Sequence, residues 1–118
     1  MRAPSALLTS LFLLGLSACS KTIELHLPST ASVTIYDMST GKQRIIEPKT
    51  ELHQKLSRWT NNNQEGWQPY LATPPAQGII VRAEGLDVQF IGEHAIVHSP
   101  KGVFTKKVNS DELAFLPK

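Results

Sequence analysis

The chain has 118 residues with 12 basic and 10 acidic side chains, and its formal net charge at pH 7 is +2. A chain of this length forms one small domain with a modest core. Charges of both signs are interspersed, and no block of lysine and arginine occurs, which argues against a nucleic-acid partner.

The first residues combine a positive charge with a short apolar run. Arg2 precedes an apolar run over residues 6–14 that is broken only by Thr9 and Ser10. This run is shorter than the roughly 20 apolar residues that a helix needs to span a bilayer. A charged start, a short apolar middle and small residues before a break are typical of a secretory signal peptide. We therefore expect residues 1–18 to be a signal peptide.

The run ends in Leu16, Ser17, Ala18 and Cys19. These four residues resemble the lipobox of bacterial lipoproteins, in which a signal peptidase cuts just before the cysteine. The resemblance implies a diacylglyceryl group on the Cys19 sulfur and a third acyl chain on the new amino terminus. Two or more acyl chains anchor a protein stably, whereas one holds it only marginally. The alternatives are an ordinary secreted protein with a stray cysteine, or an uncleaved anchor.

The resemblance also implies a location in the bacterial cell envelope. In Gram-negative lipoproteins, an aspartate after the cysteine tends to retain the protein in the inner membrane. Ser20 therefore predicts a lipid-anchored protein of the outer membrane that faces the periplasm. Cys19 is the only cysteine, so its acylation would leave no thiol for a disulfide, a thiolate metal site or a nucleophile.

The first stretch after the anchor alternates apolar and polar residues. Ile23, Leu25 and Leu27 alternate with polar neighbours until Pro28. We expect residues 19–32 to be the lipidated amino terminus with a tether or a first strand.

A single domain is then expected over residues 33–118. The β-branched and aromatic residues 33–36 predict a strand, and the turn residues 37–41 connect it as a hairpin to a second strand at 42–47.

One amphipathic helix follows Pro48. Thr50 is a plausible N-cap, and Leu52, Leu56 and Trp59 recur at i, i+4 and i+7 on one face. His53 falls on the polar side of this pattern. The helix is expected to end within residues 61–63 and to pack on a flat apolar surface.

That surface is predicted from four later strands at residues 78–84, 86–90, 95–99 and 103–108, which are separated by glycine turns. Short strands at this spacing favour an antiparallel meander with one solvated face. Residues 109–116 predict a short carboxyl-terminal helix with acidic residues in its first turn. The expected fold class is α+β: a small twisted antiparallel β-sheet (meander), with one main amphipathic helix on one face and a short C-terminal helix.

The connection over residues 66–77 is the candidate binding segment. Loops of this length are uncommon in compact domains and are often functional. Its candidate partner-binding residues are Trp67, Tyr70, Pro74 and Pro75, since Trp and Tyr often dominate binding energy at interfaces. In the favoured alternative, Trp67 and Tyr70 fill the gap between helix and sheet. A third hypothesis is that a partner recognises the extended Pro74-Pro75 segment.

No catalytic residue, metal site or cofactor is predicted. His94 and His98 are four residues apart, which on a strand separates them by about 13 Å, too far to share a metal. Glu84, Asp87 and Glu93 are interpreted as solvated turn residues. No nucleophile elbow or phosphate-binding glycine loop occurs in the sequence.

The leading functional hypothesis is a non-enzymatic envelope lipoprotein that binds a periplasmic or envelope protein. Such a protein would act as an inhibitor, an immunity protein or an accessory factor. The alternatives are a lipoprotein that binds a lipid or small hydrophobe between helix and sheet, and a peptidoglycan- or lipid-acting enzyme. In the enzyme alternative, Glu93 with His94 or His98 would be the acid/base residues. The membrane is itself a predicted partner, since acyl chains on Cys19 would insert into it.

Overall fold

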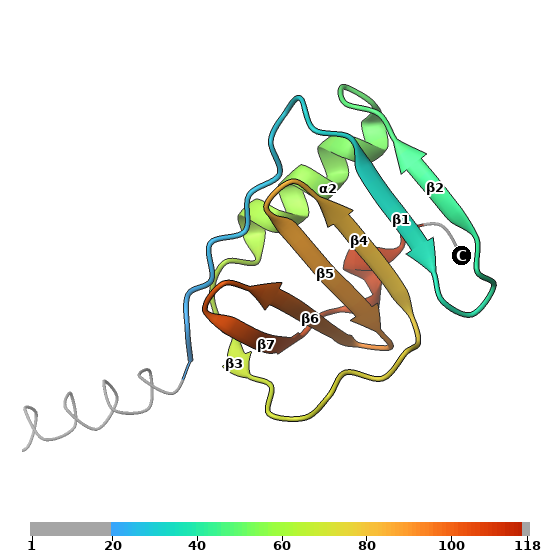
Figure 1. Ribbon diagram of the computed structural model, residues 1–118. Coiled ribbons are helices and arrows are strands. Elements are labelled where there is room, and N and C mark those ends of the chain that lie inside the picture. Colours follow the sequence, from blue (N-terminus) through green and yellow to red (C-terminus); the bar gives the residue numbers. More distant parts are fainter. Residues whose placement is uncertain (1–19, 117–118) are drawn as a thin grey trace, which may run out of the picture.

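The computed structural model describes residues 20–116, which form an antiparallel sheet with one α-helix across it (Figure 1). The described elements are β1 (Val33–Asp37), β2 (Gln43–Ile46), α2 (Glu51–Asn62), β3 (Gln68–Pro69), β4 (Ile79–Ala83), β5 (Leu86–Ile91), β6 (His94–Ser99), β7 (Gly102–Lys107) and a 3-10 helix (Ser110–Leu113). The lipobox, including Cys19, lies outside the described residues.

The strands lie in the order β2-β1-β4-β5-β6-β7-β3, and each neighbouring pair is antiparallel. β4 to β7 form the predicted meander of consecutive hairpins. The β1–β2 hairpin, also predicted, joins this meander on the outer side of β4. The short strand β3 pairs with β7 at the opposite edge.

One face of the sheet is the core. The strand register aligns Ile35, Val81, Val88, Val97 and Phe104 in a row across five strands, and all five side chains are buried. Side chains alternate between the faces of a strand, so the residues between these positions point to the other face, which we call the open face. This alternation is the pattern from which the strands were predicted.

The helix α2 covers the core face, as predicted. The Thr50 hydroxyl caps it by accepting a hydrogen bond from the His53 N–H at 3.3 Å. Leu56 and Trp59 are buried, and the Trp59 ring meets Phe90 of β5 edge-on with ring centroids 5.0 Å apart. The helix therefore packs against the middle of the sheet.

The prediction that His53 lies on the polar side of the helix is wrong. Its side chain is buried, and its Nε2 donates a hydrogen bond to the Ala31 carbonyl oxygen at 2.8 Å. The helical pattern alone did not reveal this contact, because Ala31 belongs to an earlier segment of the chain.

Residues 20–32 were expected to form a tether or a first strand, and in the structure they form neither. Ile23, Leu25 and Leu27 are all buried in the main core cluster. The segment makes a single isolated bridge, from Lys21 to Trp67, and the side-chain amide of Gln64 bonds the backbone of Leu25 on both its N–H and its carbonyl. The domain therefore begins about ten residues earlier than predicted.

The predicted carboxyl-terminal helix is a single 3-10 turn over Ser110–Leu113. The Asn109 side-chain oxygen caps it by accepting from the Asp111 N–H at 3.0 Å. Leu113 and Leu116 then pack onto the core, and this contact closes the domain.

Candidate functional site

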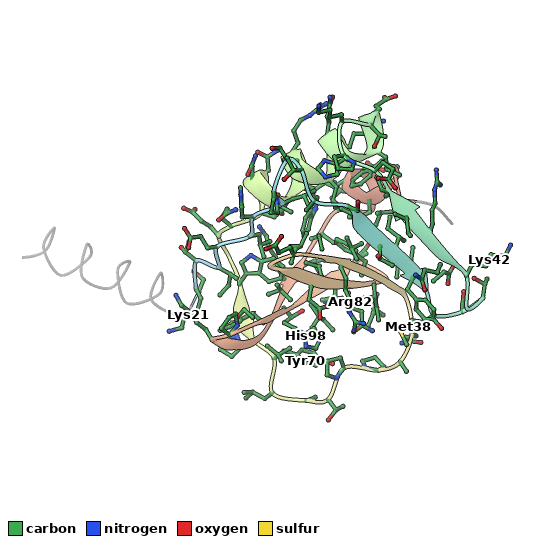
Figure 2. All side chains as sticks on the ribbon, turned by 45° about the horizontal axis from the view of Figure 1, so that its top comes forward. Lys21, Met38, Lys42, Tyr70, Arg82 and His98 are labelled. Carbon is green, nitrogen blue, oxygen red and sulfur yellow. The ribbon has the colours of Figure 1, made fainter. Side chains whose placement is uncertain are left out.

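The candidate site lies on the open face of the sheet. The connection from β3 to β4, residues 70–78, passes the sheet on the side opposite α2 (Figure 1). Figure 2 shows Tyr70, Arg82, His98 and Met38 on this side, between the sheet and the connection. We call residues 70–78 the proline loop because it contains Pro74 and Pro75.

One glutamine of the sheet holds the middle of the proline loop. Gln89 of β5 is only 5% exposed, although it points to the open face. Its Nε2 donates to the carbonyl oxygens of Pro75, at 2.7 Å, and Gln77, at 2.8 Å. Buried amides need such partners, so the loop and the glutamine fix one another.

Both ends of the loop are also held by the sheet. The Tyr70 N–H donates to the Val103 carbonyl at 2.9 Å, and the Met38 N–H donates to the Gly78 carbonyl at 3.0 Å. Gly78 has a φ of 87°, and a side chain there would collide with the Phe90 carbonyl oxygen. A glycine is therefore required where the loop enters β4.

The loop and the sheet enclose a hollow of about 250 Å³ on the open face. It is lined by Met38, Pro74, Pro75, Ala76, Ile80, Arg82, Asp87, Gln89 and His98. The proline side of this hollow is apolar, whereas its sheet side is charged.

Three charged or titratable side chains line the hollow. Arg82 Nε lies 3.5 Å from Asp87 Oδ2, and the two side chains are 64% and 36% exposed. Val88 pairs with Val97, so Asp87 and His98 occupy opposite positions on β5 and β6. The register thus places Arg82, Asp87 and His98 side by side on three adjacent strands.

This arrangement is suited to binding rather than to holding a buried charge. An ion pair as exposed as Arg82–Asp87 is screened by solvent and contributes little to stability. Its guanidinium and the His98 imidazole are open to a polar group of a partner, while Met38 and Ile80 offer apolar contacts beside them. A mixed surface of this kind is typical of protein interfaces.

The two predicted aromatic contacts of the loop have different positions. Trp67 is fully buried, and its Nε1 donates to the Asn63 carbonyl oxygen at 2.7 Å. Trp67 therefore fills the core next to the end of α2, as in the favoured alternative, and does not present a contact surface. Tyr70 is partly buried at the start of the proline loop, and its N–H is bonded to Val103, the residue of β7 that pairs with His98.

The two predicted prolines both line the hollow. Pro74 is partly buried, and Pro75 is exposed while its carbonyl is bonded to Gln89. Among residues 20–116, the most exposed large apolar residue is Leu71 of the same loop, at 97%. Leu71 was missed, because a single leucine in a loop carries no sequence signal for exposure.

The sequence also gave no signal for Arg82 and Gln89. Both occupy polar positions of alternating strands, where any solvated side chain would fit the pattern. The role of Arg82 and Gln89 depends on the proline loop that crosses the open face. The contacts between this loop and the strands are long-range, so a local sequence pattern does not reveal them.

Of the residues of the enzyme alternative, Glu93 and His94 are consecutive and lie beside Lys107, whereas His98 occupies another position on β6. Glu93 lies 3.9 Å from Lys107, and His94 pairs with Lys107 across β6 and β7. His98 is four residues further along β6, beside Asp87. Among residues 20–116, no group of three or more His, Cys, Asp or Glu side chains is arranged to hold a metal ion.

A second hollow of about 440 Å³ lies where the 3-10 helix meets the ends of β4 and β5. Its apolar lining includes Ile79, Phe90, Leu113 and Leu116, with Asp111 at its edge. The volume is within the range of small-molecule pockets.

Comparison of the chain with protein-family models, with curated proteins and with solved structures finds no match in any of the three. In the described part of the chain, neither helix has the length and apolar character needed to cross a membrane.

Proposed function

We propose that the protein is a lipoprotein of the bacterial envelope, anchored through Cys19, that binds another envelope protein without catalysing a reaction. The lipobox residues Leu16 to Cys19 support the anchor. The proline loop, held over the open face by Gln89, is the observation that supports the binding role. Ser20 after the cysteine favours the outer membrane, on the side of the periplasm.

The open face has the composition of a contact surface. Leu71 is 97% exposed, Ile45 is 58% exposed and Tyr36 is 37% exposed. Tyr36 pairs with Ile80 across β1 and β4, and Ile45 lies on the same face of β2. Tyr36 and Ile45 lie on the face that also carries Arg82 and His98, and Leu71 belongs to the proline loop held over that face by Gln89; a partner would cover them together.

The anchor is tested by labelling cells with palmitate. The wild-type chain is expected to incorporate the label, and Cys19→Ala is expected to lose it and to appear in the soluble fraction. Incorporation that persists in Cys19→Ala would refute acylation at this residue.

The binding role is tested by affinity capture from envelope membranes. We expect an envelope protein whose affinity for the double variant Leu71→Ser with Ile45→Ser is at least about 30-fold lower and whose recovery falls accordingly, because interface apolar anchors contribute about 1–2 kcal/mol each and about 1.4 kcal/mol is a factor of ten. Gln54→Ser, exposed on α2 and away from the open face, is the matched control and should leave recovery unchanged. Equal recovery with all three proteins would rule out the open face as the contact surface.

The hollow between the 3-10 helix and the sheet favours a second candidate function, the binding of a small hydrophobe or lipid chain. Ile79, Phe90 and Leu116 would enclose the ligand. Native mass spectrometry of the purified protein tests this candidate. A co-purifying ligand that is lost in Ile79→Asp would support it, and a ligand-free wild-type protein would refute it.

A further inference from the structure

The described chain is fixed to the domain from its first residues. The Lys21 N–H donates to the Trp67 carbonyl at 2.7 Å, and the Trp67 N–H donates to the Lys21 carbonyl at 3.1 Å. Two residues later, the Ile23 N–H donates to the Gln64 carbonyl at 2.7 Å. Trp67 is completely buried, so this double bridge connects Lys21 directly to the core.

This attachment leaves almost no spacer after the predicted lipidation site. Cys19 precedes Lys21 by two residues, and an extended chain spans at most about 3.3–3.6 Å per residue, so the two are within about 7 Å. The polar headgroup layer on one side of a bilayer is itself only about 5–8 Å thick. With acyl chains on Cys19, Lys21 would lie within this layer or at its outer boundary.

We infer that the domain lies directly on the membrane through one defined end, which consists of Lys21, Gly66, Gln68 and Lys106 and which we call the anchor surface. This inference rests on the acylation of Cys19 proposed above. The four residues are neighbours, because Lys21 is bridged to Trp67, the Lys106 side chain lies over Gly66, and Gln68 pairs with Thr105 of β7.

The charges of the anchor surface suit a layer of phosphate headgroups. Lys21 is exposed and Lys106 is half-buried, and neither makes an ion pair within residues 20–116. A lysine near an anionic membrane surface is attracted to it electrostatically. Glu65, next to Gly66, and Glu24, three residues after Lys21, are exposed acidic residues that offset part of the attraction.

A defined anchor surface gives the domain an orientation. The anchor is next to β3, which is one edge of the sheet, and β2 is the other edge. Six strand spacings of about 4.8 Å place these edges about 29 Å apart across the sheet. Figure 2 shows Lys21 and Lys42 at opposite ends of the molecule. The β3 edge would face the lipid, and the β2 edge would project away from it.

Two matched glutamines make this orientation measurable. Gln68 on β3 and Gln43 on β2 are both exposed strand residues, and Cys19 is the only native cysteine. Full-length acylated Gln68→Cys and Gln43→Cys proteins are labelled with a bimane fluorophore and placed in vesicles of phosphatidylethanolamine and phosphatidylglycerol. The lipid headgroups carry a nitroxide, which quenches a nearby fluorophore. We expect the label at position 68 to lose most of its fluorescence and the label at position 43 to keep most of it.

A spacer variant provides the control. About ten glycine and serine residues inserted between Ser20 and Lys21 add a mean reach of about 17 Å. In this variant, quenching at position 68 is expected to fall toward the value at position 43. Equal quenching of the two labels without the spacer would overturn the proposal, as would quenching at position 68 that the spacer does not reduce.

Palmitate incorporation is measured in the same preparations. An unacylated protein would refute the proposed anchor itself. An acylated protein with equal quenching at both positions would refute only the fixed orientation on the lipid. Far-ultraviolet circular dichroism establishes that each variant is folded.

Discussion

Trp67 and Tyr70 are only three residues apart, yet they contribute to the protein in different ways. The indole of Trp67 is surrounded by the core, and its N–H is bonded to Asn63. Tyr70 belongs to the proline loop and is only partly buried. A stability measurement can separate the two roles.

We expect Trp67→Ala to lower the free energy of unfolding by about 3–5 kcal/mol, because it leaves a large cavity and an unpaired carbonyl. Since small domains are stable by only about 5–15 kcal/mol, this is a large fraction of the total. Tyr70→Ala should cost clearly less. Urea unfolding, followed by far-ultraviolet circular dichroism, measures both, and equal losses would contradict the assignment of Trp67 to the core.

Asp37 gives the β1–β2 hairpin a dependence on pH. Its carboxylate accepts hydrogen bonds from the Ser39 hydroxyl, at 2.7 Å, and from the Ser39 N–H, at 2.9 Å. These bonds favour the charged form and hold the pKa of Asp37 below its ordinary value of 3.8.

Because the folded-state pKa is the lower one, the contribution of Asp37 to stability is present above the ordinary pKa and is lost as pH falls through the folded value. Asp37→Asn should therefore destabilise the protein slightly at neutral pH, and the difference from wild type should shrink in strong acid. Thermal unfolding at several pH values provides the comparison. A difference that does not change with pH would show that the charge of Asp37 is unimportant.

Among the elements, the proline loop depends on the sheet beneath it. It has no regular structure of its own, and Gln89, Val103 and Met38 supply its contacts with the sheet. A loop held in this way is preformed. Binding a partner therefore costs less conformational entropy, because the loop is already ordered.

Gln89→Leu keeps a side chain of similar size but removes both donors to the loop. Since each hydrogen bond contributes about 0.5–1.5 kcal/mol, we expect the Gln77 and Met38 amides to exchange about tenfold faster with deuterium. The amides at the centres of β5 and β6 should be unaffected. Gln43→Leu, on the exposed edge strand, is the control. Unchanged exchange at the Gln77 amide would show that other contacts fix the loop.

For the whole molecule, residues 20–32 decide where the domain begins. Ile23, Leu25 and Leu27 fill the core in alternation, while the Gln64 side chain bonds the backbone of Leu25. A segment that behaved as a tether could be deleted without loss of stability.

We expect a chain that starts at Ser20 to fold and one that starts at Pro28 to remain unfolded or to aggregate. Each of the three aliphatic side chains contributes about 2–5 kcal/mol when buried, so their sum is comparable to the stability of a small domain. Circular dichroism and urea titration of the two chains test this. Equal stability would show that the segment is dispensable.

The sequence by itself determined the local structure of this protein. β-branched and aromatic residues with turn residues between them predicted β1 and β2, and short strands separated by glycine turns predicted the meander. A helical repeat of apolar residues with a Thr50 cap predicted α2, because these patterns depend only on neighbours along the chain. The lipobox residues likewise form a local pattern, which is why Cys19 is predicted without a structure.

Only the tertiary structure decided how the polar and irregular parts are used. His53, Gln64 and Gln89 look like solvated side chains in the sequence, yet each holds a distant segment of backbone by hydrogen bonds. The order of β1 beside β4, the burial of Trp67 and the attachment of Lys21 to it also arise from contacts between residues far apart in the chain. Such contacts form where burying a polar group requires a partner, and the position of that partner is set by the folded chain as a whole.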